Sequence, residues 1–460
     1  MLPAVASIWD ANAKVTEWTF HLRADARFSN GARVTAQDFK FAWERLFTGP
    51  VEGWAGHMLG NVKGAAAMAA GKATHLSGVV ARNKTTLVVT LRTPCADFPS
   101  TVANMTLAPV PRDLLSTARR AAQFHNAPVG NGPFMLAEPW DGRDTFSLVP
   151  APRYSGTAPD IAGLTFTVIA DPAVAYAQFQ AGALDVASFP AASLAEVEAA
   201  YGTSTDGFTA EPGHQVVRGP RGGVMYWVFN TMKAPLNNVL VRRAFSLAVD
   251  RTKLCDAVST VAVRTPANDV LSPGVPGYVP GQWPYAKTDL AQAAALLAEA
   301  GFPGGVGLPE ITFLTVDDAG LSEYQTALAA IGVKLRFVEV GQAEFSAKWH
   351  SGELMTSQVG WTDDAPTADN VLYNLFYGPL HGSSVVYDDP AVNALLRRAR
   401  ATRNTAARLA AFQSIDATVG ADAPVAPIAY MSRTVVCSAR LHEAVLSPMN
   451  LFDFTRVWIE

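Results

Sequence analysis

Strand and helix patterns alternate regularly between residues 289 and 420, and this alternation constrains the fold more than any other feature of the sequence. Asp289 precedes a helical run that stops at Gly301, and two strand patterns follow at Ile311–Val316 and Val333–Val340 with a second helical run between them. An Asp-Pro pair at 389–390 then begins another helix, because proline suits the first helical position. The alternation predicts a sheet with helices on its faces.

The rest of the chain extends this prediction to two lobes. The first third is richer in strands and turns, and the nearly all-apolar run Val224–Asn230 is typical of a central strand covered on both faces. A chain of 460 residues exceeds what one hydrophobic core can serve. We therefore expect an α/β protein with two lobes, each built on a mixed sheet.

Composition excludes several classes of function. A net charge of −4 and a pI near 6.1 give no electrostatic footprint for nucleic acid, and no apolar stretch reaches the roughly 20 residues of a membrane span. The three cysteines, Cys95, Cys255 and Cys437, are widely spaced, so they form neither a disulfide framework nor a metal knuckle. Buried thiols are the expectation, with one bridge at most.

The stretch Gly360–Asn370 is the candidate site. An apolar strand pattern ending at Trp361 and Thr362 leads into the polar positions Asp363, Asp364, Asp369 and Asn370, which are expected to lie in a loop. An aspartate shielded by a large aromatic side chain can pair with a cation that arrives on a ligand. The same residue types also make ordinary surface turns, so local spacing leaves both interpretations open.

Catalytic and cofactor motifs are missing from the sequence. The eight histidines are scattered, and neither a zinc motif nor a nucleophile elbow nor a phosphate-binding loop occurs. Asp363 and Asp364 are a conceivable acid/base pair of a hydrolase, but adjacent residues on a strand point to opposite faces. We expect no catalytic residues, no metal and no cofactor.

Several ordered motifs together carry a family resemblance. They are Pro3–Trp9, Trp18–Arg23, Phe28–Gly31, Val34–Phe39, Val129–Phe134, Phe229–Asn230, Val241–Phe245 with Ala248–Asp250, Leu297–Phe302, and Gly360–Trp361 with Asp369–Asn370. In this order they resemble family 5 of the extracytoplasmic solute-binding proteins of ABC importers, which includes the dipeptide and oligopeptide receptors.

The resemblance implies a two-lobed periplasmic-binding-protein-like fold of class II with a hinge. Lobe 1 would comprise residues 1–233, with a smaller subdomain at about 40–155, and residues 431–460 would return to it. Lobe 2 would comprise residues 234–430. The strands near 230–234 and 430–433 would form the hinge, and the ligand would be enclosed between the lobes.

The resemblance also implies roles for individual residues. In the peptide receptors the aspartate three residues after the tryptophan binds the ligand's α-amino group, and that position is Asp364 here. Gly360, Trp361 and Thr362 would offer a strand edge to a peptide backbone. Asp363 and Gln342 complete the expected ligand-binding set, and Gln342 stands where peptide binders place another tryptophan.

This sequence departs from the dipeptide receptors at the position of their carboxylate-binding arginine. Leu321–Tyr324 contains no arginine, and Glu323 would repel a carboxylate. The ligand alternatives therefore include a longer or capped peptide, a cationic amine and a sugar-like solute.

The resemblance predicts the partners and the location. We expect a monomer that docks on an ABC permease with its ATPase and meets the membrane only peripherally through that permease. The N-terminus lacks a signal peptide, so the chain is either cytoplasmic or shortened. The resemblance favours a shortened chain whose full-length form carries a signal, usually with a lipoprotein cysteine, and is periplasmic or on the cell surface. A ligand sensor without a transport role is the main alternative function.

Overall fold

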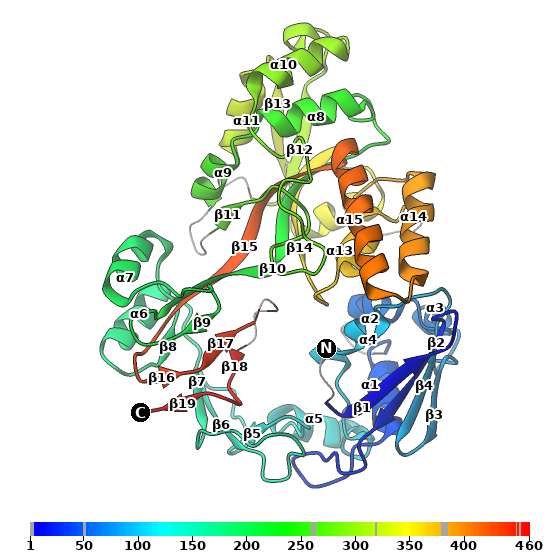
Figure 1. Cartoon of the computed structure of the whole chain (residues 1–460), viewed down its shortest axis with the longest axis vertical. Coiled ribbons are helices and arrows are strands. Elements are labelled where there is room, and N and C mark those ends of the chain that lie inside the picture. Colours follow the sequence, from blue (N-terminus) through cyan, green and yellow to red (C-terminus); the bar gives the residue numbers. More distant parts are fainter. Residues whose placement is uncertain are drawn as a thin grey trace.

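A computed structural model describes residues 4–48, 52–258, 264–317, 320–378, 385–447, 449 and 452–460. The elements form three parts (Figure 1). The first part is the N-terminal unit, residues 4–115. The second, the outer unit, comprises residues 116–220 and 434–460. The third is the central unit, residues 221–433, which lies above the other two in Figure 1.

The N-terminal unit is a four-stranded antiparallel sheet with helices packed on one face. Its strand order is β1-β2-β4-β3. The fully buried indole of Trp43 anchors the helices, because its Nε1 donates a hydrogen bond to the carbonyl of Leu107 at 2.9 Å. The elements are β1 (Ala6–Ala11), β2 (Glu17–Leu22), α1 (Ala36–Arg45), α2 (Glu52–Leu59), α3 (Ala65–Ala69), β3 (Val79–Asn83), β4 (Thr86–Thr90), α4 (Phe98–Val102), η1 (Met105–Leu107) and η2 (Arg112–Leu115).

The central unit contains a mixed sheet in the order β11-β15-β10-β14-β12-β13. The pairs β12·β13 and β12·β14 are parallel, and the remaining pairs are antiparallel. The strands are β10 (Val216–Phe229), β11 (Arg264–Pro266), β12 (Ile311–Thr315), β13 (Leu335–Glu339), β14 (Thr356–Thr362) and β15 (Val425–Cys437). The predicted mixed α/β architecture is confirmed.

Helices cover both faces of this sheet, because β10 alternates its apolar side chains between two cores. Trp227 and Phe229 pack with α8, α10 and α11, whereas Tyr226 and Val228 pack with α13, α14 and α15. The helices of this unit are α8 (Val239–Ala248), α9 (Arg251–Val258), α10 (Leu290–Glu299), η4 (Pro303–Gly305), α11 (Ser322–Ala329), α12 (Gln342–His350), α13 (Ala368–Phe376), α14 (Pro390–Ala401) and α15 (Thr405–Asp422).

Strands β10 and β15 connect the central unit to the outer unit. They pair with each other from Val216↔Val436 to Val228↔Val425, and the register shifts between Pro220 and Val224. Both strands run down from the central sheet in Figure 1. The outer unit contains α5 (Ala118–Asn126), β5 (Phe134–Leu136), β6 (Thr145–Pro150), β7 (Leu164–Thr167), α6 (Pro172–Gln180), β8 (Val186–Ala187), η3 (Ala191–Ser193), α7 (Leu194–Tyr201), β9 (Thr209–Ala210), β16 (Leu441–His442), β17 (Ala444–Leu446), β18 (Phe452–Asp453) and β19 (Trp458–Ile459).

Some expected elements differ from those observed. The patterns at 428–430 and 435–436 predict two strands, but β15 is continuous because the intervening polar residues Ser432, Arg433 and Thr434 also pair with β10. The pattern at 452–459 predicts one strand, but β18 and β19 are separate and pair with different partners. All three cysteines are buried and free, as expected.

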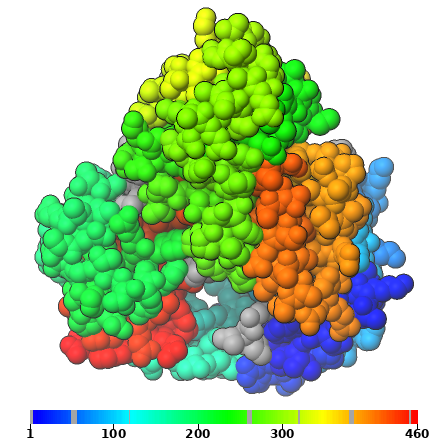
Figure 2. Space-filling view, turned by 45° about the horizontal axis from the view of Figure 1, so that its top comes forward, coloured from blue at the N-terminus to red at the C-terminus, as the bar shows by residue number. Residues whose placement is uncertain are grey.

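A gap is visible where the three units meet (Figure 2). The helices α14 and α15 of the central unit lie directly above the N-terminal unit in Figure 1. None of the helices in the described residues is long and apolar enough to cross a membrane.

Candidate functional site

The end of β14 presents a strand edge at the boundary of the central unit. Gly360, Trp361 and Thr362 pair on one side with β10, at Met225, Val224 and Gly223. On its other side, β14 pairs with β12 through Thr356 and Phe313, at the end of β14 opposite to Gly360–Thr362. Gly360 and Thr362 are exposed and Trp361 is half-buried. In the described residues this end of β14 therefore has backbone groups that an extended ligand can pair with.

Asp364 lies two residues beyond the strand and joins the central unit to the N-terminal unit. Its Oδ2 accepts a hydrogen bond from Nε2 of His57 at 2.7 Å, and its carbonyl accepts one from Nδ2 of Asn104 at 2.8 Å. Its own N–H donates to Oδ1 of Asn370 at 3.1 Å. The side chain is only 10% exposed. A carboxylate this buried needs a positive or hydrogen-bonding partner, and His57 supplies one.

Asp363 is also buried, but its contacts lie within the central unit. Its N–H donates to the carbonyl of Gly222 at 3.1 Å, and the hydroxyl of Ser272 is 3.5 Å from its Oδ2. Burial, together with the nearby charge of Asp364, raises the pKa of Asp363 to about 7, and the hydrogen bond from Ser272 opposes that rise. Two adjacent carboxyl groups thus differ in their surroundings.

Asp369 and Asn370 are not in a loop, which corrects the expectation from the sequence. They lie in the first turn of α13, where the side chain of Thr367 caps the helix by accepting from the N–H of Asn370. Asp369 forms a buried ion pair with Nε of Arg400 at 3.0 Å. The guanidinium of Arg400 also stacks on Tyr373, 3.6 Å from the ring centre. These three residues belong to the central unit, and Sγ of Cys95 in the N-terminal unit lies 3.7 Å from Oδ2 of Asp369.

Gln342 is the first residue of α12 and is exposed. Its amide donates to the hydroxyl of Ser346 in the same helix at 3.4 Å. It follows β13 rather than β14, so the structure brings Asp363, Asp364 and the end of β14 together and leaves Gln342 on a different connection. Its role in ligand binding stays a prediction.

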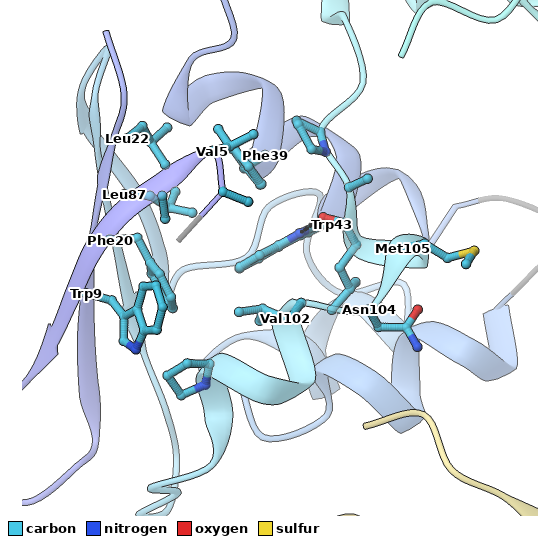
Figure 3. Close-up of a pocket in the computed structure, with 17 residues that line it drawn as sticks. Val5, Trp9, Phe20, Leu22, Phe39, Trp43, Leu87, Val102, Asn104 and Met105 are labelled. Carbon is cyan, nitrogen blue, oxygen red and sulfur yellow. Dashed lines mark hydrogen bonds between the residues drawn. The ribbon is translucent and has the colours of Figure 1, made fainter. Parts of the chain in front are cut away.

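Two cavities border the site. A polar chamber of about 330 Å³ lies between α2 and α13, and its walls include His57, Asn61, Arg92, Tyr373 and Arg400. A second cavity of about 220 Å³, partly open to solvent, lies between the sheet and the helices of the N-terminal unit, and its walls are mainly apolar (Figure 3). Its lining includes Val5, Trp9, Phe20, Leu22, Phe39, Trp43 and Val102. In Figure 3 the labelled rings of Trp9, Phe20 and Trp43 line this space.

Sequence reasoning missed His57, Asn104, Arg92 and Arg400. None of them belongs to a recognisable motif, and His57 is 307 positions away from Asp364. The only sequence signal for His57 is its placement in a short helical segment with glycines at 56 and 60. In the described part of the chain, no cluster of three or more histidine, cysteine, aspartate or glutamate residues could hold a metal ion.

Comparison with known proteins decides the family. Residues 1–381 match the family model "Bacterial extracellular solute-binding proteins, family 5 Middle". The chain belongs to family 5 of the bacterial extracellular solute-binding proteins. The resemblance inferred from the motifs is therefore confirmed.

Proteins similar to this chain have different ligands in their names. The probable deoxycholate-binding periplasmic protein YgiS of Escherichia coli (strain K12) is 28% identical over 93% of this chain and 79% of its own length. The periplasmic murein peptide-binding protein MppA of the same organism is 27% identical with the same coverage. The solved unliganded open form of the murein tripeptide-binding protein MppA has a TM-score of 0.80 and 25% identity, and the match covers 100% of this chain and 88% of that one.

Proposed function

We propose that this protein is the substrate-binding component of an ABC importer, and that it captures a peptide-like or other small polar solute between two lobes. We assign residues 1–233 and 431–460 to lobe 1 and residues 234–430 to lobe 2, so that segments 221–233 and 431–433, which lie in the central unit, cross between the lobes. Membership of a solute-binding family supports a binding role rather than catalysis. Relatives named as periplasmic proteins support an extracytoplasmic location. Delivery to a membrane permease with its ATPase is part of the proposed importer role.

One observation carries the proposal: a nearly buried carboxylate lies beside an open strand edge at the junction of the units. Asp364 is 8% exposed and lies two residues beyond the edge formed by Gly360–Thr362. A dry carboxylate prefers an ammonium or similar donor, whereas a strand edge prefers an extended amide backbone. A solute with an amino group and amide bonds satisfies both.

Closure of the lobes gives selectivity. Strands β10 and β15 connect the outer and central units, and the register shift near Pro220–Val224 lies where they leave the central sheet. Rotation about this connection would enclose the solute, and any polar group left unpaired in the closed site would cost binding free energy. Docking of the closed form on the permease would then begin transport.

The test is binding of the natural solute to matched variants. The solute is identified by mass spectrometry of small molecules released from the purified protein, and its affinity is measured by calorimetry. Asp364→Asn is expected to weaken binding about tenfold or more, since it removes one charge-assisted hydrogen bond. Asp185→Asn is the control, because Asp185 pairs with Arg440 in the outer unit. Equal affinities of the two variants would remove Asp364 from the site.

A sensor without transport would bind the same solute. Co-purification with the permease separates the two roles, because only an importer component is expected to associate with it in the presence of the solute. Turnover of the solute on long incubation would instead support the hydrolase alternative.

A further inference from the structure

One oxygen of the Asp364 carboxylate, to which a ligand cation could bind, already accepts a hydrogen bond from a side chain of the protein. Nε2 of His57 lies 2.7 Å from Oδ2 of Asp364. A carboxylate oxygen only accepts hydrogen bonds, so His57 Nε2 carries the proton and donates it. The side chains of His57 and Asp364 are 29% and 10% exposed, so the hydrogen bond is partly shielded from water.

The aromatic wall of the site also contacts this histidine. The rings of His57 and Trp361 meet edge to face, with centroids 5.4 Å apart. Trp361 belongs to the strand edge proposed to bind the ligand backbone. His57 therefore touches both the proposed charge anchor and the proposed backbone site, although it comes from α2 of a different unit.

We propose that His57 is a specificity-determining residue of this site, and that a ligand binds Asp364 only when its own cation displaces the imidazole. The inference rests on the proposed function and names the ligand class: a solute with an amino or other cationic group that hydrogen-bonds a carboxylate better than imidazole does. Neutral solutes would leave the hydrogen bond between His57 and Asp364 in place.

The chamber between α2 and α13 provides room for the displaced ring. His57 lines this chamber of about 330 Å³, and so do the polar side chains of Asn61, Arg92 and Tyr373. An imidazole that turns away from Asp364 thus enters a polar space instead of an apolar core, which avoids the cost of burying an unpaired polar group. Both positions of the ring are therefore possible without unfolding α2.

The first experiment measures cation binding at Asp364 by thermal unfolding, with imidazole or methylammonium chloride as the probe and sodium chloride at equal ionic strength as the reference. In His57→Ala the carboxylate loses its donor, so either probe is expected to raise Tm by roughly 1–2 °C. The wild-type protein and the double variant His57→Ala/Asp364→Asn should show no such rise. His75→Ala is the matched control, because His75 pairs with Glu44 on the surface of the same unit.

The second experiment tests competition with a ligand, using trialanine and N-acetyl-trialanine in calorimetry. Trialanine is expected to bind His57→Ala at least several-fold more tightly than wild type, and the acetylated peptide should not distinguish them. His57→Gln keeps a side-chain donor and the approximate volume. Its affinity for trialanine should therefore lie between those of wild type and His57→Ala.

The outcomes separate the two proposals. Failure of both probes to stabilise His57→Ala overturns the role of His57, whether or not peptides bind. Weaker trialanine binding by His57→Ala also overturns it, since His57 would then contribute to affinity. Loss of binding in Asp364→Asn with no change in His57→Ala would leave the proposed function standing and remove His57.

Discussion

Asp97 of the N-terminal unit accepts two hydrogen bonds from the guanidinium of Arg408 in α15, at 3.0 Å from Nε and 2.9 Å from Nη2. Both side chains are largely buried, at 16% and 9% exposure. The same guanidinium also donates to the carbonyls of Thr402 and Arg403. This bidentate pair fixes the N-terminal unit to the central unit close to the Asp369–Arg400 pair.

Removing one member of the Asp97–Arg408 pair is expected to loosen this junction. Asp97→Asn leaves the Arg408 cation without its carboxylate, which should lower the free energy of unfolding by about 3 kcal/mol. Hydrogen exchange is expected to rise in α4 and in the first turns of α15, and urea unfolding gives the stability change. Asp113→Asn serves as the surface control. Equal stabilities of the two variants would contradict the role of Asp97.

The raised pKa of Asp363 predicts a pH dependence of stability. Burial raises its folded-state pKa from 3.8 to about 7, so the folded state holds this proton more tightly than the unfolded state does. The stabilising contribution of the Asp363 proton to the free energy of unfolding is therefore fully present below pH 4 and is lost as the pH rises to about 7.

Asp363→Asn tests this sign, because an amide has no proton to lose. The variant is expected to gain a few kcal/mol relative to wild type between pH 5 and pH 8, measured by urea unfolding at both values. Asp185→Asn, which removes a carboxylate whose pKa is lowered by its hydrogen bond with Arg440, should not show this gain. A constant difference between Asp363→Asn and wild type across this range would refute the assignment.

Gly223 allows the close approach of β10 to β14 at the site. Its φ is +153°, and a Cβ there would lie 2.6 Å from the carbonyl oxygen of Trp361. Gly223→Ala is therefore expected to cost about 1–3 kcal/mol and to weaken solute binding, since it displaces the strand edge. Gly132→Ala is the control, because its added Cβ meets no atom within 4 Å. Unfolding and calorimetry on both variants check this, and unchanged binding by Gly223→Ala would contradict it.

A second pair of buried carboxyl groups predicts a fall in stability that extends to a higher pH than the fall caused by Asp363. Asp269 and Asp416 are fully buried, and Nε1 of Trp283 donates to Oδ1 of Asp416 at 2.9 Å. Burial and the neighbouring carboxyl group raise the pKa of Asp269 to about 9. Wild-type stability should therefore fall as the pH rises from about 4 to about 9, and Asp269→Asn should reduce this fall in thermal unfolding. A fall of the same size in the variant would count against the pair.

Local patterns predicted the mixed sheet because its segments alternate over short distances. Val224–Asn230 is apolar at successive positions, and the structure explains this, because β10 serves a core on each face. The prediction of a loop at Asp369 and Asn370 was wrong, because these residue types are typical of loops but here form the first turn of α13. Their burial depends on Arg400, an ion-pair partner supplied by another helix.

The sequence predicted only the part of the site that the central unit contributes. Trp361 and Asp364 are close in sequence and carry a family motif, whereas His57 reaches Asp364 only through the packing of two units. Such a contact leaves no local signal, since hydrogen-bond partners distant in the chain have no fixed spacing. The division into lobes and the ligand-binding roles of Gly360, Trp361, Thr362, Asp363, Asp364 and Gln342 stay predictions.

The most direct test is a crystal structure of the protein with its co-purified solute. We predict that the solute lies between the lobes, chemically unaltered, with a cationic group within hydrogen-bond distance of Asp364, its chain along Gly360–Thr362, and the His57 ring turned away. A solute bound only in the apolar cavity beside Trp43, or with no contact to Asp364, would contradict the account.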